Sequence, residues 1–88
     1  MNIRDLDWDE ENIAHIAAHH VEPDEVEDIC YGRNLAERAG EGKHGVLGQT
    51  LEGRYLFIVI AHKGEGVFRP ITARDMTETE RRRFQKHQ

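Results

Sequence analysis

The sequence predicts an α+β fold with two N-terminal helices, an antiparallel β-meander of three to four strands and a C-terminal helix. Three observations carry this prediction. Apolar residues recur at helical spacing before residue 32, strand-like apolar runs separated by glycine turns follow up to residue 73, and a capping box opens the last segment. With 88 residues, we expect one domain, spanning 1–88.

The first helix is expected over about residues 10–20, after a short strand or extended arm within residues 1–7. Ile13, Ile16 and Ala17 form one apolar stripe, and Asp7 or Asp9 supplies the N-cap.

The second helix is expected to start at Pro23, with Glu22 as its N-cap, because proline suits the first helical position. Val26, Ile29 and Cys30 form its buried stripe. Gly32 is expected to close it in a left-handed conformation.

The strands follow in the order of the meander. Residues 34–38 are a weak, polar strand candidate, and 43–51 and 54–62 form a pair around a two-residue turn at Glu52-Gly53. The centre of 54–62 is apolar on both faces, which indicates a central strand covered on both sides. In the last strand, 67–73, Pro70 lacks an N–H and therefore predicts a sheet edge or a bulge.

The final helix is expected over 77–86, where Thr77 and Glu80 form a capping box. Phe84 is its one large apolar residue, so we expect the helix to be weakly held. A surface for a partner protein is predicted here, from Arg81, Arg82, Arg83 and Phe84.

Charge is unevenly distributed along the chain. The net charge is −5, and residues 1–30 carry ten acidic residues and one basic residue. The remaining residues carry 11 basic and seven acidic residues. Overall composition argues against a strongly basic nucleic-acid binder, whereas the cationic second half is compatible with a phosphate-binding surface. The acidic residues are equally compatible with a partner-binding surface and with solvated helix faces.

The composition predicts a cytoplasmic protein that binds no membrane. The longest apolar run, 56–61, is too short to span a bilayer, and no apolar N-terminal stretch indicates a secretory signal. The single cysteine, Cys30, suits a reducing compartment.

Six basic residues on the predicted strands are candidates for a phosphate site, because a meander brings side chains of neighbouring strands together. Arginine binds phosphate in a bidentate manner, and histidine exchanges protons near neutral pH. Simple alternation places Arg69 and Arg74 on opposite phases, although Arg74 lies past the expected strand end. Ordinary exposed charges remain the alternative interpretation. The six candidates are Lys43, His44, Arg54, His62, Arg69 and Arg74.

Two further chemistries are weaker possibilities. His15 and His19 have the i, i+4 spacing of zinc ligands, but no further ligands accompany them, and we expect no metal and no cofactor. Cys30 lies on the buried stripe of an acidic helix, which does not suit a nucleophile.

Several short motifs resemble the BrnT toxin family. Trp8-Asp9-Glu10, Ala18-His19-His20-Val21 and the acidic Pro-Asp-Glu-Val start of the second helix resemble its N-terminal half. The segment 69–74 is similar to the family's R-x-I-S-A-R motif, and 80–84 to its E-R-R-x-Y motif. The sequence departs from the family pattern at Ala18, His20 and Pro70.

The resemblance implies a RelE-like fold and the toxin of a bacterial type II toxin–antitoxin system. The expected activity is metal-independent RNA cleavage that arrests growth. The expected partner is a ribbon-helix-helix antitoxin. Operator DNA would be bound by this antitoxin and not by the toxin itself. Arg69 and Arg74, which match the family's last-strand motif, would stabilise the transition state. On strand placement alone, His44, or His62 in its place, would act as acid or base. Substrate-binding residues would be Lys43, Arg54, His62 and Tyr55, the last by stacking a base.

Two alternatives remain open. The first is a non-catalytic protein-interaction module of the same fold, which the acidic balance favours. The lesser alternative is a metal-binding domain built on His15 and His19.

Overall fold

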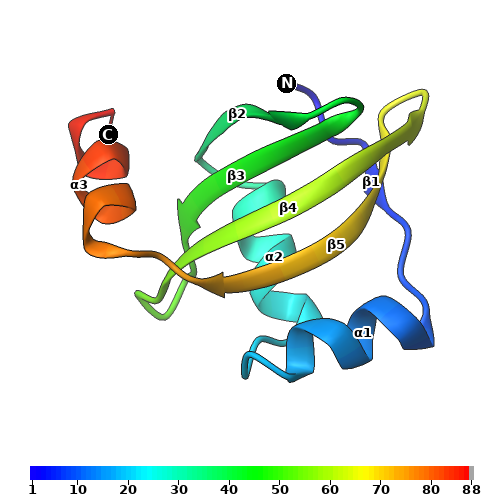
Figure 1. The fold of residues 1–88 in the computed structure, drawn as a ribbon, viewed down its shortest axis with the longest axis horizontal. Helices are drawn as coiled ribbons and strands as arrows, with labels where there is room; N and C mark the ends of the chain where they lie inside the picture. The colour runs from blue at the N-terminus through cyan, green and yellow to red at the C-terminus, as the bar shows by residue number, and fades with distance from the viewer. Residues whose placement is uncertain (88) are drawn as a thin grey trace.

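The computed structural model describes residues 1–87 and contains three helices and a five-stranded mixed sheet (Figure 1). The strand order is β1-β5-β4-β3-β2, in which β1 pairs with β5 in parallel and the other pairs are antiparallel. The α+β prediction is therefore confirmed. The sheet is larger than the predicted three to four strands, because Asp5–Leu6 (β1) joins it beside β5.

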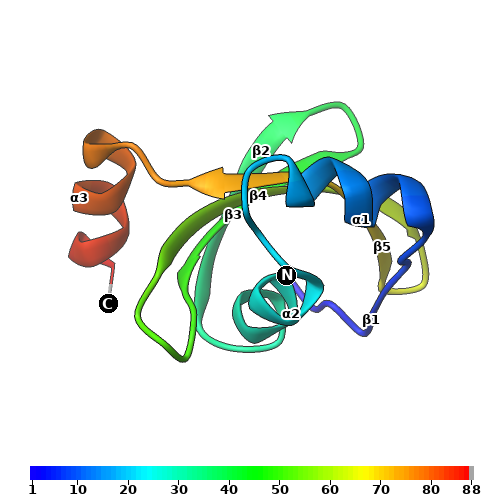
Figure 2. The same cartoon turned by 90° about the horizontal axis from the view of Figure 1, so that it is seen from below.

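The two N-terminal helices leave one face of the sheet largely open. Pro23–Cys30 (α2) packs under the sheet, whereas Glu10–Ala17 (α1) runs along β5 (Figure 2). The sheet face toward α2, here called the helix face, carries the buried core residues Leu56, Ile58 and Ile60. Side chains that alternate with these residues along the strands lie on the opposite face, here called the open face.

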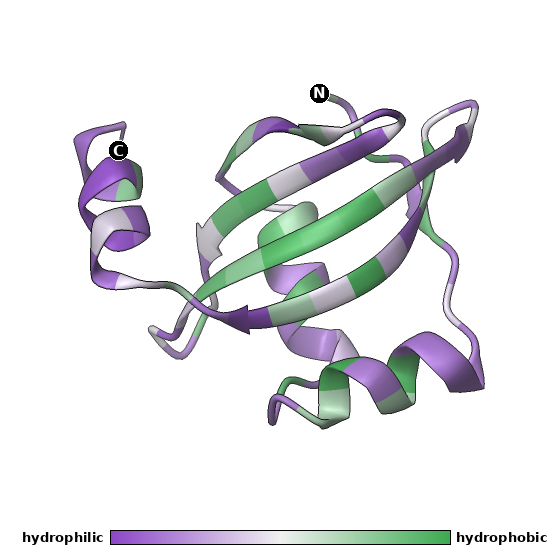
Figure 3. Cartoon of the chain, in the orientation of Figure 1, coloured by the Kyte–Doolittle hydropathy of each residue, from purple (hydrophilic) through white to green (hydrophobic). Residues whose placement is uncertain are grey.

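The core lies between the helix face and α2. It includes Ile16 of α1, Val26 and Ile29 of α2, and Ala73 of the sheet. The longest hydrophobic stretch of the sheet runs along its central strand, Tyr55–Gly64 (β4), as Figure 3 shows. Within residues 1–87, no helix is long and apolar enough to cross a membrane.

Both N-terminal helices begin at the caps that their sequences indicate. The Asp9 carboxylate accepts a hydrogen bond from the Asn12 backbone N–H, and Asn12 accepts one from the Asp9 backbone in return. Glu22 precedes Pro23 as the N-cap of α2. Helix α1 ends at Ala17, earlier than the predicted residue 20, because the chain turns there and reaches a φ of 60° at His20.

Helix α2 ends beside Gly32 as predicted, but the reason for a glycine at this position differs from the predicted one. Gly32 does not have a positive φ, so the expected left-handed cap is wrong. Glycine is nevertheless required, because a Cβ at position 32 would lie 2.6 Å from the Asp28 carbonyl oxygen. The residue permits a close backbone approach rather than an unusual dihedral angle.

The strands extend beyond several predicted bounds. Asn34–Gly40 (β2) pairs with Lys43–Gln49 (β3), and β3 pairs with β4. The β3–β4 connection is longer than the predicted two residues. The Thr50 N–H donates to the Arg54 carbonyl across it, and Gly53 takes a φ of 96°.

The last strand, Val67–Asp75 (β5), contains an irregularity at the position of the proline. Val59 pairs with Thr72, but Ile60 pairs with Pro70, so Ile71 is an extra residue in the ladder. The bulge predicted from Pro70 is therefore confirmed. Glu78–Lys86 (α3) then starts at the predicted Thr77 and Glu80 capping box.

Candidate functional site: the cationic open face

The bulge in β5 places Arg69 and Arg74 on the same face of the sheet. By register, Arg74 lies opposite Phe57 and Arg69 lies opposite Ala61, and both β4 partners belong to the open face. These partners are four residues apart, which corresponds to a separation of about 13 Å along the strand. Two predicted phosphate ligands thus share one surface.

Lys43 extends this surface on the other side of β4. It pairs with Ala61, so Lys43, Ala61 and Arg69 form one row across three strands. The Lys43 side chain is exposed. Together with Arg74, these cations form what we call the cationic open face, defined by Lys43, Arg69 and Arg74.

Arg74 is held by an aromatic ring and by a carboxylate. Its Cζ lies 4.5 Å from the centre of the Phe57 ring, which is a cation–π distance. Its Nη1 and Nη2 donate to the two Glu80 oxygens at 2.8 and 3.0 Å. The hydrogen bond from Arg74 lowers the pKa of Glu80, which favours the ionised carboxylate.

Phe57 can lie flat under Arg74 because the neighbouring strand carries a glycine. A Cβ at Gly45 would stand 2.8 Å from Cε1 of the Phe57 ring. Gly45 and Phe57 thus belong to the support of Arg74. Sequence reasoning identified Phe57 only as part of a strand expected to be covered on both sides, whereas the face that carries Phe57 is only half-buried. It identified Glu80 only as a capping residue. The sequence did contain one signal for the position of Phe57: it alternates with Leu56 along the strand, so the two side chains must lie on opposite faces of the sheet.

Arg69 is engaged by the start of α1. Its guanidinium donates to the Asp9 carboxylate, and Nη2 also lies 3.0 Å from Glu11. The hydrogen bond from Arg69 lowers the pKa of Asp9. Since Asp9 also caps α1, this contact ties the helix to β5 and partly neutralises Arg69.

The histidines lie on the other side of the sheet. His44 pairs with buried Ile60, and its ring centre lies 5.8 Å from that of Phe68, a core residue. His62 pairs with Phe68, at 5.0 Å between ring centres. The structure therefore groups His44 and His62 on the helix face and separates them from Arg69 and Arg74.

Arg54 forms hydrogen bonds with three segments that are distant from it in the sequence. It donates to the His20 carbonyl at 2.6 Å, to Glu25 of α2 at 3.1 Å, and to Asp75 at the end of β5 at 2.9 Å. These contacts join α2 and the turn that follows α1 to the end of β5. They direct the guanidinium away from the cationic open face.

The C-terminal helix packs at the end of the sheet and divides the predicted partner residues into two groups. Phe84 is buried, with its ring centre 6.2 Å from that of Tyr55, and Arg83 binds Glu37 of β2 at 2.8 Å. Phe84 is therefore not available to a partner while α3 keeps this position. Arg81 and Arg82 are exposed.

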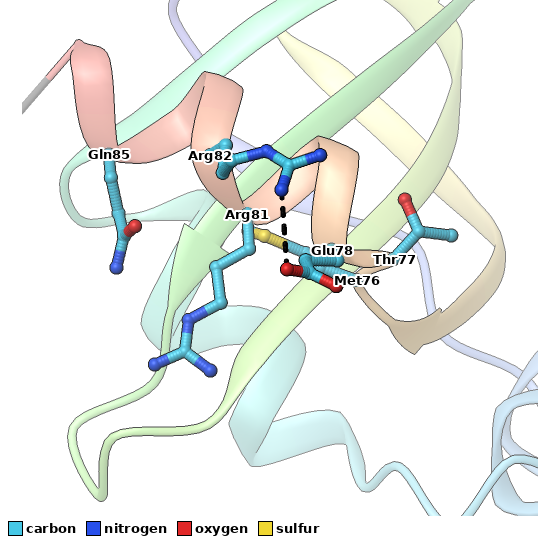
Figure 4. A pocket seen from close by; sticks show the side chains of 6 residues that line it. All are labelled: Met76, Thr77, Glu78, Arg81, Arg82 and Gln85. Atoms are coloured by element: carbon cyan, nitrogen blue, oxygen red, sulfur yellow. Dashed lines mark hydrogen bonds and ion pairs between the residues drawn. The ribbon is translucent and has the colours of Figure 1, made fainter.

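The exposed side of α3 borders a shallow pocket of about 550 Å³. Arg81 and Gln85 project from the helix, whereas Arg82 pairs with Glu78 (Figure 4). The Cζ of Arg81 also lies 4.1 Å from the centre of the Tyr55 ring. The face of Tyr55 expected to stack a base is thus in contact with Arg81.

Neither a metal centre nor a cysteine nucleophile is formed by the described residues. Within 1–87, no group of three or more His, Cys, Asp and Glu side chains is placed to hold a metal ion, and the His15 and His19 ring centres lie 6.3 Å apart. Burial raises the pKa of the Cys30 thiol to about 12, which suppresses the reactive thiolate.

A family model and a solved structure are both similar to this chain. The family model described as the ribonuclease toxin BrnT of type II toxin–antitoxin systems matches residues 8–80. The chain is also similar in structure to the Brucella abortus ribonuclease toxin BrnT, with a TM-score of 0.69 and 16% sequence identity. That match covers 84% of this chain and 97% of the Brucella chain. No curated protein matches the sequence.

Proposed function

We infer a function from one premise: this chain belongs to the BrnT family of ribonuclease toxins of type II toxin–antitoxin systems. Membership in the family implies an antitoxin partner. We propose that this chain is itself an active ribonuclease of RelE-like fold, that it needs no metal ion, and that RNA binds on the cationic open face. The placement of Arg69 and Arg74 on one face is the observation that carries this proposal.

The proposed reaction is an internal transesterification. The ribose 2′-hydroxyl attacks the adjacent phosphorus, the bond from phosphorus to the 5′ oxygen breaks, and a cyclic phosphate and a free 5′-hydroxyl result. Water would accept the proton that leaves the 2′-oxygen, and water would supply the proton that reaches the 5′-oxygen. Arg74 would stabilise the extra negative charge of the transition state, and Arg69 and Lys43 would hold the flanking backbone. His44 and His62 have no part in this scheme, because they lie on the helix face.

The partner is proposed to be a ribbon-helix-helix antitoxin that also binds operator DNA. To neutralise the toxin, it would cover the cationic open face with acidic or apolar segments. Arg81 contacts Tyr55 on the open face, and both Arg81 and Arg82 are exposed, so they are the contacts of α3 that we propose for the antitoxin. Arg83 and Phe84 would instead hold α3 in place.

Induced expression of the chain tests the proposal directly. We expect growth arrest, cleavage of cellular RNA, and rescue by the protein encoded beside this gene. Arg74→Ala should abolish arrest and cleavage while the circular dichroism spectrum and melting curve stay close to those of the wild type. An Arg74→Ala variant that is folded and fully toxic would exclude Arg74 from the reaction.

The non-catalytic interaction module is the second candidate. It is favoured by one observation: Arg69 and Arg74 are each paired with carboxylates, so the face is less positive than its arginines suggest. This function predicts binding of a protein partner without RNA cleavage and without growth arrest. The induction experiment therefore separates the two functions.

A further inference from the structure

We propose that Glu80 is a positioning residue for RNA cleavage, because it fixes the Arg74 guanidinium in the orientation that meets the scissile phosphate. This inference rests on the proposed function and adds a residue from α3 to it. Glu80 would touch neither RNA nor the reacting atoms, and would act only through Arg74.

The hydrogen bonds of Arg74 leave one edge of its guanidinium available. The Arg74 guanidinium has five N–H donors. One N–H of Nη1 and one N–H of Nη2 donate to Glu80, and Nη1 also donates to the Asp75 carbonyl at 3.1 Å. Among the described residues, the N–H of Nε and the second N–H of Nη2 have no acceptor. These two groups lie side by side, which is the arrangement that binds a phosphate in a bidentate manner.

Phe57 restricts the remaining freedom of Arg74. The ring covers one face of the guanidinium, while Glu80 holds the end that carries Nη1 and Nη2. A long, flexible arginine side chain is thus oriented before substrate arrives. Preorganised charge of this kind costs no reorganisation during the reaction, which is why it lowers the barrier effectively.

Glu80 is itself rigidly placed. Its Oε1 accepts the Thr77 backbone N–H at 2.9 Å, its own N–H donates to the Thr77 hydroxyl, and its side chain is 14% exposed. The Thr77 backbone N–H, which is present whatever the side chain at position 77, therefore helps to fix the carboxylate that holds Arg74. A carboxylate that merely masked Arg74 would have to leave before phosphate binds, whereas here the Arg74 side chain is 39% exposed with Glu80 in place.

The decisive variant is Glu80→Gln. Glutamine is accepted at this position of a capping box, so the start of α3 is preserved while the charged bidentate partner of Arg74 is lost. We expect kcat for cleavage of a single-stranded RNA to fall about tenfold to a hundredfold. Binding of the matching all-2′-deoxy oligonucleotide, which cannot react, should stay within about threefold, because backbone contacts dominate it.

Two matched controls separate positioning from helix stability. Thr77→Ala weakens the capping box but leaves the contact between Arg74 and Glu80, and Glu37→Gln removes the other ionic tie of α3 to the sheet. Both variants should keep kcat within about threefold of the wild type. A loss in either control equal to that of Glu80→Gln would assign the effect to α3 anchorage and overturn the inference.

A double-mutant cycle tests whether Glu80 acts through Arg74. In an Arg74→Lys background, Glu80→Gln should cause no further loss, since the bidentate pair is already broken. Full additivity, or faster cleavage by Glu80→Gln alone, would overturn the inference and indicate an independent or masking role. A wild type that cleaves no RNA, or an Arg74→Ala variant as active as the wild type, overturns the proposed function as well. Loss in Arg74→Ala with normal Glu80→Gln activity overturns only the inference.

Discussion

Arg69 and Arg74 lie on the same face of the sheet although five positions separate them along β5. Regular alternation would put residues with an odd separation on opposite faces. The extra residue at Ile71, next to Pro70, restores the phase. The same register leaves His44 on the helix face, so the arrangement of the strands decides which cations can act together.

The His44→Ala variant therefore distinguishes a reaction on the open face from one in which His44 acts as the acid or base. We expect kcat for RNA cleavage to remain within about threefold of the wild type, because His44 and Arg74 occupy opposite faces. General acid–base catalysis contributes about 10²–10⁴-fold. A loss of that size in single-turnover cleavage by a folded His44→Ala variant would contradict the assignment of the reaction to the open face.

Arg54→Met should lower the free energy of unfolding at neutral pH by about 1–3 kcal/mol, because it removes charged hydrogen bonds that join α2 and the turn after α1 to the sheet. The hydrogen bond from Arg54 lowers the pKa of Asp75 below its ordinary value of 3.8. A lowered folded-state pKa stabilises the fold above that value, and the stabilisation is lost as pH falls through the folded-state pKa.

Urea unfolding of the two proteins across pH checks this sign. The gap between wild type and Arg54→Met should be constant near neutral pH and shrink below about pH 4. A gap that widens in acid would show that Arg54 does not stabilise the fold through its carboxylate partners.

Gly48→Ala should destabilise the fold by about 1–3 kcal/mol through overpacking. A Cβ at this position would stand 2.5 Å from Cγ2 of Ile29, at the contact between β3 and α2. Chemical denaturation measures the change. The matched test is the Ile29→Ala background, in which the clashing atoms are absent and Gly48→Ala should cost much less. Equal costs in both backgrounds would point to a backbone effect.

Cys30 should be inert in the folded protein. Burial raises the pKa of its thiol to about 12, so the thiolate is scarce at pH 8 and the sulfur is also inaccessible. A thiol-reactive chromogenic disulfide reagent should label Cys30 only after urea is added. Rapid stoichiometric labelling of the native protein would show that α2 opens readily.

Arg81→Ala and Arg82→Ala should weaken the complex with the antitoxin more at low salt than at high salt. Both side chains are exposed, and ions screen such contacts over a Debye length of about 10 Å at 0.1 M salt. Calorimetric titration at two ionic strengths measures the effect. A salt-independent loss would argue against an electrostatic contact with α3.

Phe84→Ala is expected to behave differently from these arginine variants. It removes the buried ring that packs on Tyr55, so the stability of α3 should fall at any salt concentration. If Phe84→Ala left stability unchanged and weakened only the complex, Phe84 would be a partner contact after all.

Local patterns in the sequence determined much of this fold. The caps at Glu22 and Thr77 and the irregularity at Pro70 depend on interactions within a few residues, which the sequence records directly. The apolar run within residues 54–62 likewise indicated the central strand. The family resemblance was likewise contained in short motifs, and the match over residues 8–80 agrees with it.

Tertiary structure alone decided which charges meet. The phase of β5 depends on a single inserted residue, and the partners Asp9, Glu80 and Asp75 reach Arg69, Arg74 and Arg54 only after the chain has folded. Alternation along one strand carries no information about the register between strands or about the carboxylates supplied by helices. The register between strands places His44 on the face opposite Arg69 and Arg74. The carboxylate supplied by α3 determines which edge of Arg74 is left for a substrate.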